Sequence, residues 1–182
     1  MTLLEELIEA VERGDLASVS HFLSQGLDLN SDSGSSTVLY QVVLSLCDER
    51  TPHRYEIMKL ILESGADPNF RGAHDDSPLY QPIFNMDTEM LRLLLEAGAD
   101  LNAPGLCDPP ESFYDFSEFD YRYEVWDGKL PINEITEEEK KDEEGWLRLL
   151  DRMAVKYERR RPDYLFLLRK HGAKTSRENS AT

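Results

Sequence analysis

The chain has 182 residues, a length close to that of one domain. Its 36 Asp and Glu residues outnumber its 20 Lys and Arg residues, which gives a formal net charge of −16. This charge argues against binding to nucleic acid or to an anionic membrane surface, since both need a basic protein face, and it favours a basic partner. No run of sequence approaches the roughly 18 apolar residues that a membrane span needs.

The two cysteines, Cys47 and Cys107, cannot form a disulfide framework. Unpaired thiols suit a reducing compartment. The first residues are acidic, whereas a secretion signal begins with basic residues. We therefore expect a cytoplasmic protein.

Four segments of the chain share one pattern, at residues 14–30, 57–69, 91–102 and, more weakly, 164–174. In each segment Leu and Ile recur at helical spacing, which predicts a short helix with one buried stripe. A glycine then follows the last helical residue, where a left-handed backbone costs it little. An Asp and an Asn follow in the first three copies, and both suit turns. Each copy thus predicts a helix, a stop and a projecting turn.

A second short helix is expected upstream of each copy. In the third copy it opens with Ser77-Pro78-Leu79-Tyr80, where Ser77 can cap the helix and Pro78 suits its first position. Thr37-Val38-Leu39-Tyr40 are the matching residues of the second copy. The third copy has Met86 where the first has Gly14, which predicts a different turn between the two helices.

The glycines recur after 39 residues, from Gly26 to Gly65, and after 33 residues, from Gly65 to Gly98. With Ser77–Tyr80 and the run from Leu94 to Asn102, this sequence resembles the ankyrin repeat family, whose period is about 33 residues. The resemblance covers roughly residues 1–102 and 143–174. It implies an all-α, helix-turn-helix solenoid in a single domain over 1–174, with a flexible tail at 175–182. The expected repeats lie at about 1–30, 36–69, 76–102 and 143–174.

From Gly98 to Gly172 the chain runs for 74 residues, so residues 103–142 are expected to form a large insertion before the last helix pair. A degenerate repeat within this stretch is the alternative. Residues 103–144 contain 14 acidic and 4 basic residues, a local net charge of −10, together with seven aromatic residues. Tyr121, Tyr123 and Val125 alternate with charged residues before Asp127-Gly128, which predicts a β-hairpin.

The resemblance implies a protein-binding module, because ankyrin repeats bind partners through their projecting loops and concave helical face. Acidic residues interleaved with aromatic ones predict that the insertion binds a basic protein, with rings as anchors and carboxylates for orientation. The alternative is that the rings cover the end of the repeat stack. The expected contact residues are Asp115, Glu118, Asp120, Tyr121, Tyr123 and Trp126 in the insertion, with Arg71, His74 and Asp75 in a projecting loop.

Motifs for catalysis or for metal and cofactor binding are missing from the sequence. The four histidines are scattered, and no Cys-x-x-Cys, His-Glu-x-x-His, Gly-x-Ser-x-Gly or phosphate-binding glycine loop occurs. The run from Asp115 to Asp120 is only a weak calcium candidate, because its spacing differs from that of an EF-hand loop. We therefore expect a protein that is not an enzyme and needs no cofactor or metal, acting as a scaffold or adaptor. The alternative is an inhibitor or immunity protein that neutralises a basic toxin such as a nuclease. The oligomeric state stays open.

Overall fold

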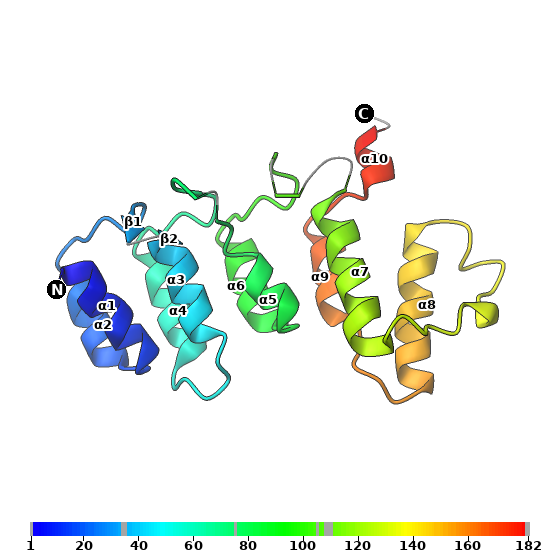
Figure 1. The fold of residues 1–182 in the computed structure, drawn as a ribbon, viewed down its shortest axis with the longest axis horizontal. Helices are drawn as coiled ribbons and strands as arrows, with labels where there is room; N and C mark the ends of the chain where they lie inside the picture. Colours follow the sequence, from blue (N-terminus) through cyan, green and yellow to red (C-terminus); the bar gives the residue numbers. More distant parts are fainter. Residues whose placement is uncertain (1, 34–35, 75, 105, 108–110, 181–182) are drawn as a thin grey trace. The chain divides into compact units, whose positions relative to one another are not determined.

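The computed structural model describes residues 2–33, 36–74, 76–104, 106–107 and 111–180 (Figure 1). This part of the chain is all-α, with ten α-helices, one 3-10 turn and one pair of two-residue strands. It divides into two compact units, Met1–Asp100 (unit 1) and Leu101–Thr182 (unit 2). None of the described helices is both long enough and apolar enough to cross a membrane.

Unit 1 consists of three pairs of helices that stand side by side in Figure 1. The pairs are α1 (Leu3–Glu12) with α2 (Leu16–Leu23), α3 (Val38–Leu46) with α4 (Arg54–Glu63), and α5 (Tyr80–Phe84) with α6 (Thr88–Glu96). The first helices of successive pairs contact one another, α1 with α3 and α3 with α5. The second helices do the same, α2 with α4 and α4 with α6. A short antiparallel strand pair, β1 (Asp32–Ser33) and β2 (Ser36–Thr37), precedes α3.

Several helices begin at residues whose side chains cap them. The Thr37 side chain accepts a hydrogen bond from the backbone N–H of Tyr40 at the start of α3. At the start of α6, Asp87 accepts one from the N–H of Met90. Each bond satisfies an amide that has no partner inside its own helix, so these residues fix where the helices start.

The turn between paired helices is the same in the first and third pairs, so the different turn predicted from Met86 is wrong. Gly14 has φ 66° and Met86 has φ 52°, and both are followed by an aspartate of nearly identical backbone conformation, Asp15 and Asp87. A left-handed backbone costs a residue with a side chain about 1–2 kcal/mol. Met86 buries its side chain, which offsets that cost.

Asparagine side chains link the loops that follow successive second helices. Asn30 donates to the carbonyl oxygen of Gly65 at 3.0 Å and accepts from the backbone N–H of Asp67 at 2.7 Å. Asn69 makes the same two bonds one pair further along, at 2.9 and 2.8 Å, with Gly98 and Asp100. We call these contacts the asparagine bridges.

Unit 2 contains α7 (Phe113–Trp126), the 3-10 turn η1 (Ile132–Glu134), α8 (Glu143–Lys156), α9 (Asp163–Lys170) and the short α10 (Ser176–Ser180). An asparagine bridge recurs inside this unit. Asn102 donates to the carbonyl oxygen of Gly172 at 2.9 Å and accepts from the N–H of Lys174 at 3.0 Å. The bridge therefore joins segments separated by 70 residues of chain.

Helix α9 packs against α7, whereas the sequence predicted that its partner is the first helix of the repeat at 143–174. Tyr121 of α7 and Tyr164 of α9 meet edge to face, with ring centroids 6.3 Å apart. The Tyr164 hydroxyl donates to the carbonyl oxygen of Ser117 at 2.9 Å, and the Tyr121 hydroxyl donates to that of Arg160 at 2.6 Å. The predicted pairing is therefore wrong. The added segment, residues 127–162, lies between the two helices of the last pair instead of before them.

The predicted β-hairpin at residues 121–130 is also wrong, because residues Phe113–Trp126 form one continuous helix. The helix begins at a capping box, in which Ser112 accepts from the N–H of Asp115 at 3.1 Å and Asp115 accepts in return from that of Ser112. Phe113, Ser117 and Tyr121 are buried at four-residue intervals, which places them on one helix face. The alternation of aromatic and charged residues from Tyr121 to Val125 therefore belongs to a longer helix and does not indicate a strand.

The predicted flexible tail contains α10. The N–H of Ser176 donates to the Asp115 carboxylate at 2.8 Å, and Arg169 pairs with Glu178 at 2.7 Å. These contacts attach residues 176–180 to α7 and α9, so the prediction is wrong for this segment. Ala181 and Thr182 lie outside the described residues.

Leu94 in α6 and Leu168 in α9 are fully buried, as their equivalent positions predicted. We expect Leu94→Ala and Leu168→Ala each to lower the free energy of unfolding by about 2–5 kcal/mol, because each leaves a cavity in its core. Urea denaturation followed by circular dichroism measures this. The control is Leu44→Ala at an exposed position, where a change within about 0.5 kcal/mol is expected. A loss at Leu94 no larger than that at Leu44 would contradict the packing.

Candidate functional site

Most of the negative charge lies in unit 1. Residues 1–100 contain 18 acidic and 6 basic residues, a net charge of −12, whereas residues 101–182 contain 18 and 14, a net charge of −4. The acidic stretch at 103–144 is followed by ten basic and four acidic residues, which offset most of its charge. The attraction of a basic partner is therefore stronger toward unit 1 than toward unit 2, although the sequence analysis placed it at the insertion.

Helix α7 carries the three aromatic residues that the sequence predicted as partner contacts, but on different faces. Tyr121 is fully buried, and Trp126 is 7% exposed and packs edge-on against Tyr157 with ring centroids 6.0 Å apart. Tyr123 is exposed. The first two rings stabilise unit 2 and offer no surface to a partner, so we exclude them from the proposed interface below.

The three predicted acidic residues of α7 are partly engaged within unit 2. The Asp115 carboxylate accepts from the N–H of Ser112 in the capping box and also from the N–H of Ser176. Glu118 accepts from Trp146 Nε1 at 2.9 Å and pairs with Arg122 at 2.6 Å. Burial raises the pKa of both Glu118 and Asp120. One oxygen of Asp120 is buried and has no hydrogen-bond partner among the described residues.

The predicted loop residues belong to unit 1, so they and the α7 residues lie in different units. His74 is exposed and Arg71 is half-buried, while Asp75 lies outside the described residues. The loop is held by the N–H of Ala73, which donates to Asp32 of β1 at 3.2 Å.

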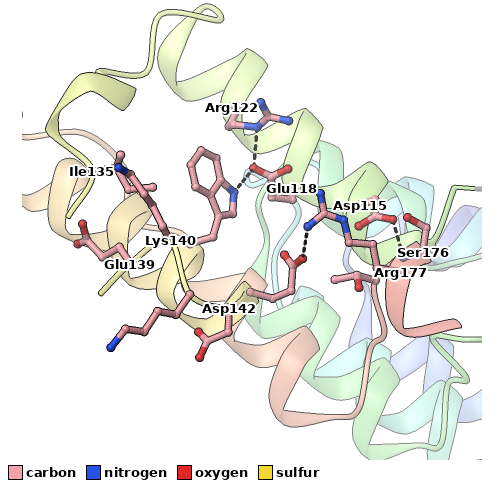
Figure 2. A pocket seen from close by; sticks show the side chains of 13 residues that line it. Asp115, Glu118, Arg122, Ile135, Glu139, Lys140, Asp142, Ser176 and Arg177 are labelled. Carbon is pink, nitrogen blue, oxygen red and sulfur yellow. Dashed lines mark hydrogen bonds and ion pairs between the residues drawn. The ribbon is translucent and has the colours of Figure 1, made fainter. Parts of the chain in front are cut away.

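A groove of about 460 Å³ in unit 2 brings Asp115 and Glu118 together with residues that the sequence analysis missed (Figure 2). Its walls come from α7, from the loop before α8 and the start of α8, and from the segment that opens α10. Trp146, Arg122 and Arg177 line it as well. The sequence places Trp146 within the expected repeat at 143–174, and nothing in its local sequence indicates that α7 lies opposite.

A second feature missed from the sequence is an apolar stripe on the first helices of unit 1. Leu44 of α3 is 51% exposed and Phe84 of α5 is 47% exposed. Leu44 lies seven residues after Thr37, and Phe84 lies seven residues after Ser77. Tyr40 and Tyr80 lie three residues after the same Thr37 and Ser77. Because α3 contacts α5, the four side chains lie on neighbouring helices. We call Tyr40, Leu44, Tyr80 and Phe84 the first-helix stripe.

Helix α7 repeats this arrangement in unit 2. Phe119 follows the capping Ser112 by seven residues and is 58% exposed. In α1 the same position is occupied by Glu9. Single exposed apolar residues are ordinary on protein surfaces, but three large ones at one structural position form a pattern. The spacing of seven residues from Thr37, Ser77 and Ser112 is the sequence signal that could have revealed it.

No group of three or more His, Cys, Asp or Glu side chains among the described residues is arranged to hold a metal ion. A scan against models of known protein families finds none that matches the chain, and a search of curated proteins finds no match.

An ion pair fixes the loop that forms one wall of the groove. Arg152 of α8 donates to both carboxylate oxygens of Glu139 at 2.8 Å, and the N–H of Thr136 donates to the same group at 2.9 Å. The bonds from Arg152, followed by those from Thr136, hold the pKa of Glu139 at about 2, well below its ordinary value of 4.5.

The depressed pKa of Glu139 predicts a pH-dependent contribution to stability. The contribution is fully present above pH 4.5 and is lost as the pH falls toward about 2, since the unfolded chain takes up the proton first. The gap in unfolding free energy between the wild type and Glu139→Gln should therefore shrink over this range. Urea denaturation at several pH values measures it, with exposed Glu137→Gln as the control. A gap that is constant with pH would show that the pair contributes nothing through ionisation.

Proposed function

We propose that this protein is a non-catalytic protein-binding module built from ankyrin-like helix pairs, and that it binds a basic protein through the first-helix stripe. The observation that carries the proposal is the recurrence of large exposed apolar side chains, Leu44, Phe84 and Phe119, at one position of three first helices. They occur in a chain whose net charge is −16.

The repeat interpretation is supported by contacts that recur along the chain. The asparagine bridges join successive loops in unit 1 and recur at Asn102 in unit 2. The left-handed residue and the aspartate cap that follow α1 are repeated after α5. We infer that ankyrin-like helix pairs recur in both units: three in unit 1, and α7 with α9 in unit 2, where residues 127–162 are inserted between the two helices.

The first-helix stripe has the chemistry of a binding surface. Burying a Leu or Phe side chain contributes about 1.5–3 kcal/mol, and tyrosine adds rigid contact area with a polar end. Carboxylates lie near these helices, including exposed Glu9 of α1, which contacts α3, and exposed Glu49 just after α3. Such charges speed the approach of a basic partner, while the apolar centre slows its release.

What the complex does depends on the partner. A partner that keeps its activity when bound favours the scaffold or adaptor role. A basic toxin, such as a nuclease, that loses its activity when bound favours the inhibitor role. Both roles require the same surface, so one set of variants tests the surface in either case.

The test captures partners on the purified chain, identifies them, and measures the affinity of a purified partner by calorimetry. Leu44→Ala and Phe84→Ala should each weaken binding by about tenfold or more, the effect of removing an anchor side chain. The affinity should also fall as salt rises. Val155→Ala, which removes a similarly exposed apolar side chain from α8, is the matched control and should bind like the wild type.

Circular dichroism checks that each variant is folded, which is expected because the altered side chains are exposed. A folded Leu44→Ala/Phe84→Ala double variant that binds with full affinity would overturn the proposed surface. Specific partners that are all acidic would overturn the proposed partner class.

A further inference from the structure

The groove in unit 2 is bounded on one side by a tryptophan that is fixed in place. Trp146 Nε1 donates to Glu118 Oε1 at 2.9 Å, which links α8 to α7. Trp146 is half-buried, so part of its ring remains accessible. An indole face is the side-chain surface that binds a cation best.

Carboxylates lie next to this indole. Arg122 Nε contacts the same oxygen of Glu118 that Trp146 uses. Because the two oxygens of a carboxylate offer about four acceptor positions, Glu118 can accept further donors. Asp115 and Glu143 also line the groove. A cation placed against the indole would therefore meet acceptors on the α7 side and at the start of α8.

The basic residues that line the groove are paired with acidic ones. Arg122 is paired with Glu118, and Lys140 contacts Glu137 at 2.6 Å. Lys141 pairs with Glu138. Both of these glutamates lie outside the groove lining. The two lysine charges are thus offset from outside, which disfavours the groove as a site for a phosphate or another anion.

Arg177 shows that a guanidinium reaches this rim. Its Nη1 lies 3.6 Å from Glu143 Oε1, beyond ordinary hydrogen-bond distance, and its side chain is 89% exposed. Exposed ion pairs of this kind contribute little stability, so the contact is easily displaced.

We propose that this groove binds an arginine side chain presented by a basic protein partner. The guanidinium stacks on the indole of Trp146 and donates to Glu118, and it displaces Arg177 from Glu143. Arginine fits better than lysine because its planar fork both stacks on an aromatic ring and donates two parallel hydrogen bonds. This inference rests on the proposed function only for the class of partner, a basic protein. The residues that line the groove all belong to unit 2, whereas the first-helix stripe belongs to unit 1.

The probe for this site is the peptide acetyl-Gly-Arg-Gly-amide, added to the full-length chain labelled with nitrogen-15. The chain has two tryptophans, so the indole N–H signal of buried Trp126 serves as an internal control for that of Trp146. The Trp146 signal should shift and saturate with peptide while the Trp126 signal stays in place. The analogue with neutral citrulline in place of arginine should leave both signals unchanged.

Variants then test the assigned roles. Glu118→Gln should weaken peptide binding by about tenfold or more, as expected when a bond to a charged acceptor is lost. Arg177→Ala should strengthen it by severalfold, because the internal competitor is gone. Glu124→Gln removes an exposed acid of α7 that does not line the groove, and it should bind like the wild type. If Glu118→Gln fails to fold, Glu143→Gln at the rim replaces it, with weakened binding as the expected result.

Three outcomes would overturn the inference. They are an unmoved Trp146 signal at millimolar peptide, equal binding by the Glu118→Gln and Glu124→Gln variants, and a larger Trp146 shift with inorganic phosphate than with the peptide. None of them bears on the Leu44 and Phe84 measurements, because those residues lie in unit 1. Failure of this site and failure of the proposed function can therefore be told apart.

Discussion

The asparagine bridge is the interaction on which the arrangement of the helix pairs depends. An asparagine side chain offers a donor and an acceptor at once, so Asn69 can bind the carbonyl of Gly98 and the N–H of Asp100 together. An aspartate at the same place could only accept. Asn102 makes the equivalent two bonds to Gly172 and Lys174 across 70 residues. Because the entropy of closing a loop grows only slowly with its length, this bridge can tolerate the long segment between its ends.

A fixed link between successive loops has a consequence for the surface. It joins the loops of successive helix pairs, and the first helices α3 and α5 of two such pairs contact one another and carry Leu44 and Phe84 at equivalent positions. The buried positions of these helices maintain the core, whereas Leu44 and Phe84 remain about half exposed. Under the proposed function, the large apolar side chains at this position contact the partner. The acidic groups of unit 1, with a net charge of −12, add attraction to a basic partner.

Local signals in the sequence predicted the parts of the fold that depend on local physics. Leu94 and Gly98 follow helical periodicity and a helix stop, and the structure places them in a buried stripe and at a left-handed residue. The pairing of α9 with α7 depends on tyrosine contacts between Tyr121 and Tyr164, 43 positions apart, which no local pattern reveals. The groove was missed for the same reason, because Trp146 and Glu118 meet only through tertiary packing. Met86 shows that burial can outweigh a backbone preference for glycine.

Amide hydrogen exchange on the wild type and on Asn69→Ala tests the asparagine bridges most directly. The amides of Asp67, Asp100 and Lys174 each donate to a bridging asparagine, so all three should exchange more slowly than exposed loop amides beside them. In Asn69→Ala, protection should be lost at Asp100 and kept at Lys174. Fast exchange of all three amides in the wild type, or unchanged protection of Asp100 in the variant, would contradict this account of how the helix pairs are joined.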